Sequence, residues 1–290
     1  MSLRLKFNLA LALAFAVGLA AAAAILHWMT LANAREEVLQ NARIMMESAD
    51  AIGAYTARDI EPLLATQITD RFLPESIPFF AAQANFKALQ RDYPDYVFKE
   101  AALNPTNPSD RASDWEADII NAFRHDAKLP ELMVERMTPT GPSLALSRPI
   151  RVTDEACLQC HSTPARAPLT MIRLYGTANG FGWKPNETVG ASIVSVPMSV
   201  ALRRATQTFW MSLGVLAATY LIIVVLLNIL LQYMVIRPVV KMAHIAGQVS
   251  LGDLNAEEYQ KTGRDEIASL STSFNRMRRS LETAMKLLNK

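Results

Sequence analysis

The chain has 290 residues, of which 51% are hydrophobic and only 19% are charged, and its mean hydropathy is positive at +0.12. This composition excludes a disordered or collagen-like chain and argues against a wholly soluble protein. With 29 basic and 27 acidic residues, the formal net charge is +2, which gives no support for nucleic-acid binding.

Two long segments, residues 7–29 and 205–236, contain no Asp, Glu, Lys or Arg. Each exceeds the roughly 20 apolar residues with which a helix crosses the hydrocarbon core of a bilayer. We therefore predict one transmembrane helix in residues 1–30 and a second in residues 205–236. Ala32-Asn33-Ala34 resembles a signal-peptide cleavage site. However, the first apolar run is longer than the roughly 7–15 apolar residues of a signal peptide, which favours an uncleaved anchor.

Basic residues flank each span on the side that faces a chain terminus: Arg4 and Lys6 precede the first span, and Arg237 and Lys241 follow the second. Positive charge beside a span favours the cytoplasmic side. We therefore expect a protein of the bacterial inner membrane, with both termini in the cytoplasm and residues 31–204 in the periplasm. Aromatic residues that favour a bilayer interface lie at the predicted outer ends of the spans: Trp28, Phe209 and Trp210.

A periodic face predicts a long helix over residues 35–64, just after the first span. Apolar and small residues recur there at steps of three and four, and Pro62 either ends the helix or falls in its last turn. The residues of this face are Val38, Ala42, Met45, Ala49, Ile52 and Thr56.

The rest of the exported region mixes helices and strands. Ser113 and Glu116 have the spacing of a capping box and predict the start of a helix. The turn signal Pro139-Thr140-Gly141-Pro142 separates two strand-like runs and predicts a hairpin. Strands that need no crossover helices indicate an α+β domain with an antiparallel sheet, and we favour a PAS-like one. The expected elements are helices at 77–90 and 113–125 and strands at 96–102, 132–138, 143–150 and 188–196.

Cys157 and Cys160 are the only cysteines, and with His161 they form a C-x-x-C-H motif. Two thiols at this spacing reach the two vinyl groups on one edge of a porphyrin, and the next residue can bind the iron. The motif is therefore typical of c-type haem. Such haem is attached outside the cytoplasmic membrane, which agrees with the topology expected from the charges. We predict one haem c per chain, bound by Cys157 and Cys160, with His161 as the metal ligand.

Two other interpretations of the cysteine pair are weaker. A thioredoxin-like dithiol would lie near a βαβ pattern, which the sequence lacks. A structural zinc site needs four ligands, and the other histidines, His27, His125 and His244, are scattered.

The sequence does not identify the sixth ligand of the iron. A His or Met ligand favours electron transfer or redox sensing, whereas an open position favours gas sensing. The candidates in the exported region are His125, Met45, Met46, Met133, Met137, Met171 and Met198. Three arginines near the motif are candidates for pairing with haem propionates: Arg148, Arg151 and Arg166.

The tail after the second span predicts two amphipathic helices, the first over residues 239–251 with Met242, Ile245 or Ala246, and Val249 facing inward. Gly252-Asp253 ends it, and a connector follows over residues 255–264. A second helix begins at Asp265-Glu266, and its narrow stripe needs a partner stripe, which favours a homodimer over a hairpin lying on the membrane. The stripe alternates steps of three and four through Ile267, Leu270, Phe274, Met277, Leu281, Ala284 and Leu288.

An ordered series of further motifs accompanies the C-x-x-C-H: Lys99-Glu100-Ala101, Asn104-Pro105-Thr106-Asn107-Pro108, Asp114-Trp115-Glu116, Arg148-Pro149-Ile150, Tyr175-Gly176, Gly180-Phe181-Gly182-Trp183-Lys184 and Ile193-Val194-Ser195-Val196-Pro197. Over most of residues 35–200 this series resembles the c-type haem sensor domain family first known from cyanobacteria. The resemblance implies a PAS-like domain with one haem c for redox or gas sensing, carried by Cys157 and Cys160 with His161 as proximal ligand. A third cysteine, which would be needed for a thiolate as sixth ligand, is absent here.

The tail resembles a HAMP module, in which Pro238, Gly252, Leu254 and Asp265-Glu266 stand where the family has them. The resemblance implies a parallel four-helix bundle in a homodimer, to which residues 237–290 of each chain give two helices.

Together these features predict a two-span sensor that detects redox state or a diatomic gas and relays it through the HAMP module to a separate cytoplasmic signalling protein. Too few residues follow for an output domain of its own, unless the chain is a truncated relative of longer receptors. The alternative is a membrane-anchored c-type cytochrome that exchanges electrons with a redox partner. We expect no enzyme, because no acid–base constellation of the kind that a haem peroxidase needs is evident.

Overall fold

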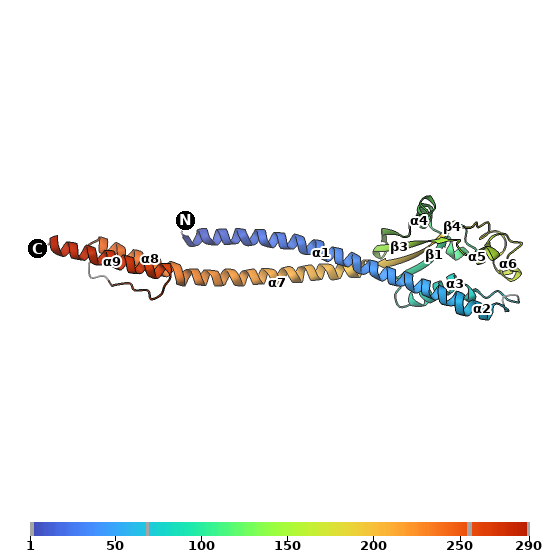
Figure 1. The fold of residues 1–290 in the computed structure, drawn as a ribbon, viewed down its shortest axis with the longest axis horizontal. Coiled ribbons are helices and arrows are strands. Elements are labelled where there is room, and N and C mark those ends of the chain that lie inside the picture. Colours follow the sequence, from blue (N-terminus) through green and yellow to red (C-terminus); the bar gives the residue numbers. More distant parts are fainter. Residues whose placement is uncertain (1–2, 68–69, 254–256, 289–290) are drawn as a thin grey trace. The chain divides into compact units, whose positions relative to one another are not determined.

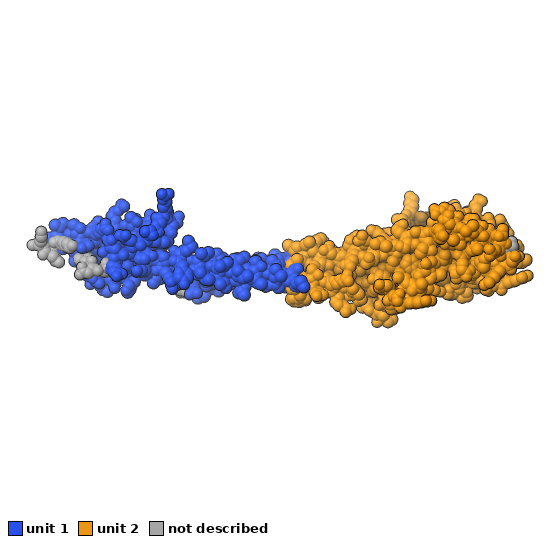
Figure 2. Space-filling model, turned by 90° about the horizontal axis from the view of Figure 1, so that it is seen from below, with its two compact units in different colours: residues 1–23, 211–290 blue, residues 24–210 orange. Residues whose placement is uncertain are grey.

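The computed structural model describes residues 3–67, 70–253 and 257–288 (Figure 1). They divide into two compact units, which are coloured separately in Figure 2. One unit is Ala24–Trp210, and the other combines Met1–Ala23 with Met211–Lys290.

The first helix, α1, runs without a break from Leu3–Tyr55. The expected helix at 35–64 is therefore the continuation of the first apolar segment and not a separate element. A π-helical turn, Thr56–Ile60, and the short helix α2, Glu61–Leu64, complete it, so Pro62 lies in the last turn. The predicted face is confirmed: Ile52 is half-buried and the other members are buried.

Residues 97–197 contain a four-stranded antiparallel sheet, which confirms the predicted α+β class. The strands are β1 (Val97–Ala102), β2 (Leu132–Thr138), β3 (Gly141–Arg151) and β4 (Thr188–Pro197), in the order β1-β4-β3-β2. The predicted hairpin is the β2–β3 pair. The last strand in sequence, β4, occupies a central position because it pairs with both β1 and β3.

Helices cover both faces of the sheet (Figure 1). Helix α4, Asp114–His125, begins with the predicted capping box and packs Ile120 and Phe123 on one face. Helices α1 and α3, Pro78–Leu89, pack on the other, where Met46 and Phe86 meet residues of β1, β3 and β4. The alternation of side chains along the strands separates these two cores, because successive residues point to opposite faces.

Two short helices, α5 (Ala156–His161) and α6 (Leu169–Tyr175), were not predicted. With six and seven residues they are too short to show a helical period. Both lie between β3 and β4 in the chain, and β4 then ends at Pro197, shortly before helix α7 begins at Ser199.

Among the residues that the structure describes, two helical segments are long and apolar enough to cross a membrane, within Arg4–Leu64 and Ser199–Ser250. They are candidate spans by length and composition. Helix α7, Ser199–Leu231, passes through a π-helical turn, Gln232–Ile236, into α8, Arg237–Ser250. The helix predicted at 239–251 therefore starts earlier and is continuous with the second apolar segment.

The C-terminal helices α8 and α9 (Glu266–Leu288) confirm the predicted helical pair. On α8, Met242, Ile245 and Val249 are buried, so Ile245 rather than Ala246 takes the inward position. The stripe on α9 is largely uncovered within one chain, and Met277 is 64% exposed. Of the predicted positions, Leu254, the start of the connector at 255–256 and the side chain of Leu288 lie outside the described residues.

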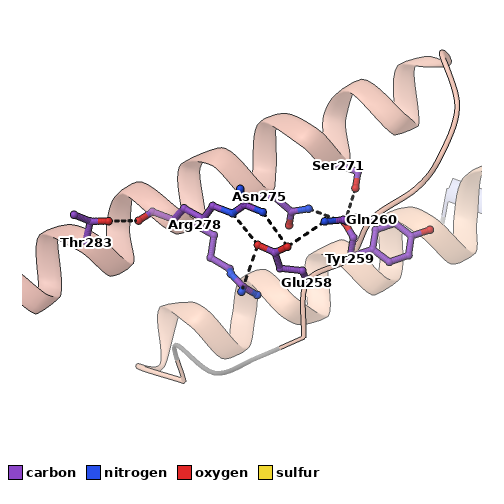
Figure 3. A network of polar contacts seen from close by, with 8 residues as sticks. Glu258, Tyr259, Gln260, Ser271, Asn275, Arg278 and Thr283 are labelled. Carbon is purple, nitrogen blue, oxygen red and sulfur yellow. Dashed lines mark hydrogen bonds and ion pairs between the residues drawn. The ribbon is translucent and has the colours of Figure 1, made fainter.

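Polar contacts hold the described part of the connector against α9 (Figure 3). The carbonyl oxygen of Tyr259 accepts hydrogen bonds from Ser271 Oγ at 2.6 Å and from Asn275 Nδ2 at 2.9 Å. Glu258 accepts two hydrogen bonds from the guanidinium of Arg279. The tyrosine ring joins Ile245, Val249 and Phe274 in a small apolar cluster between the two helices.

Candidate functional site

Cys157 and Cys160 lie on helix α5 and are free thiols, each half-buried. The carboxylate of Asp154 accepts the backbone N–H of Ala156 at 2.8 Å, which satisfies a donor at the start of this helix. Because the thiols are three residues apart on a helix, they lie on the same side of it. This side carries the predicted attachment points.

His161 is the last residue of α5, and its ring is held in one orientation. Its Nδ1 lies 2.7 Å from the carbonyl oxygen of Gly180. A carbonyl oxygen only accepts, so Nδ1 carries the proton and the neutral ring keeps its lone pair on Nε2. Burial lowers the pKa of His161, while the bond to Gly180 raises it in part, so the net shift favours the neutral ring. A neutral imidazole with a fixed Nδ1–H is the form that binds a metal.

Three further contacts join His161 and its neighbour Ser162 to the segment Gly180–Trp183. The indole of Trp183 stacks on the imidazole with ring centroids 3.9 Å apart and planes 11° apart. The N–H of Trp183 donates to the carbonyl oxygen of His161 at 3.2 Å, and the N–H of Gly182 donates to that of Ser162 at 3.0 Å. The end of α5 is therefore fixed to the segment that leads into β4.

A third segment reaches the same point. Thr106 Oγ1 lies 3.5 Å from Nδ1 of His161, and the place of a Cβ on Gly180 is filled by the Thr106 side chain. Gly180 has a φ of +83°, which favours glycine. The structure thus brings together residues 104–108, 157–161 and 180–184, which are far apart in the sequence.

Both thiols have raised pKa values. Burial is the largest cause for each, and the charge of Glu61 on α2 raises both further, as does that of Asp154 for Cys157. A catalytic dithiol or a thiolate metal site requires the opposite, because its thiols are activated by a lowered pKa. The surroundings of the pair therefore do not supply the activation that a catalytic dithiol needs.

The other candidates of the sequence fall in different places. Met45, Met46 and Met198 are buried in the core between α1, α3 and the sheet, and Met171 is buried on α6. Met133 and Met137 are exposed on β2. His125 is exposed, and its Nδ1 bonds the carbonyl oxygen of Asn121 on its own helix. The structure does not identify a sixth ligand among them.

The arginines predicted to meet propionates are also accounted for in part. Arg148 pairs with Glu47 and Asp50 of α1 at 2.8 and 3.0 Å and lies 3.7 Å from Glu131. Arg151 donates to the carbonyl oxygen of Leu129. Because the charge of Arg148 is balanced by these carboxylates, its proposed role toward a propionate is not supported, while Arg166 is exposed.

Sequence reasoning from the residues alone missed Gly180, Trp183, Thr106 and Glu61. The first three stood only in motifs of the resembling family. Their signal was compositional: a tryptophan directly after a glycine-rich segment and a threonine between two prolines. Glu61 gave no signal, because its position near the thiols depends on how α2 packs.

A buried carboxyl group lies on β1. Glu100 is buried, and its Oε2 has no hydrogen-bond partner among the described residues. Burial raises the pKa of Glu100 well above its ordinary value, and the charges of Asp110 and Asp50 raise it further, against a smaller lowering by the hydrogen bond of Gln83. Burial also raises the pKa of Asp110.

The residues present fit a covalently bound haem. Two thiols lie on one side of a short helix, and the next residue is a histidine whose Nδ1 is already bonded, leaving Nε2 as donor atom. This is the donor set that c-type attachment requires.

Comparison with known proteins gives two family matches. Residues 31–197 match the Tll0287-like family, and residues 230–283 match the HAMP domain. Among solved structures, the crystal structure of the cyanobacterial haem protein Tll0287 is similar at 17% sequence identity, with a TM-score of 0.44, covering 56% of this chain and 95% of that one. No curated protein matches.

Proposed function

Because the chain belongs to the Tll0287-like family over residues 31–197 and carries a HAMP domain over residues 230–283, we propose that it is a membrane-anchored sensor with one haem c. In this proposal Cys157 and Cys160 hold the haem and His161 is the axial ligand. The orientation of the His161 ring by Gly180 and Trp183 is the observation that carries it.

A bound haem would supply an iron that changes oxidation state or takes up a small ligand. The chain supplies a route away from it. His161 contacts Gly180 and Trp183, the chain from Trp183 enters β4, and β4 ends shortly before α7 begins. A displacement of the His161 ring would therefore act on a central strand and on the start of the second apolar helix.

The second part of the proposal concerns output. HAMP domains are dimeric signalling modules, and the uncovered stripe on α9 supports dimerisation because a narrow apolar stripe is buried by a partner helix. We propose that displacement at α7 biases two packings of the HAMP bundle, which a separate cytoplasmic protein reads.

We propose the layout predicted above for the whole chain: spans in residues 1–30 and 205–236, a periplasmic domain in 31–204, and a cytoplasmic HAMP domain in 237–290. The candidate spans and the HAMP match support anchoring in a bacterial inner membrane. We also propose that the protein is not an enzyme.

The test of the proposal is production of the full chain in a host that matures c-type cytochromes. After denaturation and extraction with acid acetone, the polypeptide should keep a haem absorption spectrum. Replacing both Cys157 and Cys160 by Ala should remove the bound pigment. His161→Ala should keep it attached but change the spectrum of the native protein, whereas His125→Ala is the matched control and should leave the spectrum unchanged. A colourless denatured polypeptide from the unmodified chain would refute haem c binding.

Spectra of the reduced protein with and without CO or NO separate the two functions considered. Binding of a gas would support an open site and ligand sensing. A six-coordinate haem that excludes both gases and exchanges electrons rapidly with a redox partner would favour the electron-transfer cytochrome.

A further inference from the structure

The tip of the β2–β3 hairpin lies beside the beginning of α7. The N–H of Met198 donates to the carbonyl oxygen of Pro142 at 2.8 Å, and a Cβ on Gly141 would lie 3.9 Å from Cβ of Ser199. Thr138 Oγ1 donates to the carbonyl oxygen of Gly141 at 2.7 Å, which closes the turn. The charge-free segment of α7 begins at Ala205, about 9 Å farther along the helix at 1.5 Å per residue.

Two ion pairs show which residues of α1 lie beside the hairpin. Arg35 pairs with Glu135 at 2.6 Å, and Arg43 pairs with Glu131 at 2.9 Å. From residue 35 to 43 the helix rises about 12 Å, and from residue 131 to 135 an extended chain covers about 13 Å. The matching lengths mean that β2 runs antiparallel to α1 in a constant register.

Extending this register places the hairpin tip. Met137 lies two residues beyond Glu135, about 7 Å along the strand, and so stands level with α1 about four residues before Arg35. The turn that follows reaches the level of Trp28, the exposed aromatic residue at the predicted outer end of the first span. Both helices thus place the tip near the predicted outer ends of the charge-free segments.

The surface of the hairpin tip is exposed, uncharged and partly apolar, as a segment at a bilayer interface requires. The side chain of Met137 is 78% exposed, and Pro139 and Thr140 are exposed as well. No charged residue occurs from residue 137 to 147. A large apolar side chain on an uncharged, exposed turn is costly in water and favourable at a bilayer interface.

We propose that the tip of the β2–β3 hairpin, residues 137–140, inserts into the headgroup region of the periplasmic leaflet of the inner membrane. This inference rests on the proposed membrane anchoring of the chain. The interfacial layers add about 10–15 Å in total to a hydrocarbon core of about 30 Å, which is about 5–7 Å on each side. Gly141, beside Ser199 and about 9 Å from the charge-free segment, therefore lies at the outer edge of one layer, and the turn at residues 139–140, which projects beyond Gly141, reaches into it. The contact gives the exported domain a third support beside its two helices and restricts its tilt relative to the membrane.

The test uses the full-length holoprotein in phospholipid nanodiscs. Spin labels on Met137→Cys and on Thr140→Cys are compared by their collision rates with oxygen, which partitions into lipid, and with a water-soluble nickel complex. In the holoprotein, thioether bonds to the haem block Cys157 and Cys160, so the unmodified chain serves as the labelling blank.

We expect the labels at 137 and 140 to be protected from the nickel complex and accessible to oxygen. Met133→Cys is the matched control, since Met133 lies on the same strand and face, is 49% exposed and stands about 13 Å farther from the tip. Its label should be more accessible to the nickel complex, and a label on Lys128→Cys, in an exposed loop, should be fully accessible.

Equal accessibility at 137, 140 and 128 would overturn the inference. A label on Val215→Cys, within the charge-free segment, separates this failure from that of membrane anchoring. If Val215 is lipid-exposed and the tip is in water, only the hairpin contact is wrong. If Val215 is also in water, the anchoring on which the inference rests is wrong. The haem spectrum of each variant reports independently on cofactor binding.

Discussion

Thr106 occupies the space that a side chain on Gly180 would need: an ideal Cβ at residue 180 would overlap Thr106 Oγ1 and lie 2.9 Å from the Thr106 Cα. The carbonyl oxygen of Gly180 is at the same time the acceptor for Nδ1 of His161. A change at residue 180 therefore moves the group that orients the predicted iron ligand.

We predict that Gly180→Ala disturbs both stability and the site. The left-handed φ costs about 1–2 kcal/mol for a residue with a Cβ, and the clash with Thr106 adds about 1–3 kcal/mol. The matched control is Gly182→Ala, because Gly182 has a similar φ of +84° but no atom within 4 Å of its Cβ position. Denaturant unfolding and the haem spectrum measure the two effects. If both variants behave alike, the close packing of residue 106 on residue 180 has no energetic role.

We predict that the stability of the domain that contains the sheet falls as pH rises through the range in which Glu100 loses its proton. The pKa of Glu100 is raised in the folded chain, so the folded state binds more protons than the unfolded state above the ordinary glutamate pKa of about 4.3. The unfolding free energy then decreases with pH from there up to the higher folded pKa.

The variant Glu100→Gln should remove this pH dependence and stabilise the domain at neutral pH. Asp110→Asn should reduce it, because the charge of Asp110 contributes to the shift at Glu100. Unfolding curves between pH 4 and pH 8 measure the slope. An unchanged slope in Glu100→Gln would show that Glu100 is not the titrating group.

We predict that the contacts of the Tyr259 carbonyl hold the connector of the HAMP domain. Asn275→Ala removes one donor and should cost about 0.5–1.5 kcal/mol, and the double variant with Ser271→Ala leaves the carbonyl without these partners and should cost about 1–3 kcal/mol more. Thr283→Ala is the control, since its hydroxyl bonds only the carbonyl of Arg279 on its own helix. Limited proteolysis of the connector in the full chain measures the effect. Equal cleavage rates in all variants would contradict it.

We predict that Met277→Cys in the membrane-anchored full chain forms a disulfide between the HAMP domains of two chains. Met277 lies on the exposed stripe of α9, and a parallel bundle brings the two copies of this stripe together. Arg276→Cys, next to it in sequence and about 100° away around the helix, should crosslink far less. Crosslinking measured with oxidised haem, reduced haem and added gas tests the relay as well. Identical patterns in every state would argue against signalling through this helix pair.

Most regular elements followed from local patterns. The face of α1 from Val38 to Thr56, the capping box at Ser113 and the turn between β2 and β3 all depend on residues within a few positions of one another. The separate start predicted for a helix at residue 35 was wrong, because a helix that continues from an apolar segment carries no cap to mark a boundary. Helices α5 and α6 were missed because one or two turns show no period.

The sequence by itself determined the chemical nature of the candidate site. The two thiols and the histidine are neighbours in the chain, so their spacing is set by the order of the residues and does not depend on the tertiary fold. It also determined the two apolar segments and the stripe on α9. Only the tertiary structure decided that Thr106, Gly180 and Trp183 surround His161, that Arg148 is engaged by carboxylates of α1, and that Glu100 is buried. These relationships join residues tens of positions apart, and they depend on the pairing of β4 between β1 and β3, which no local pattern encodes.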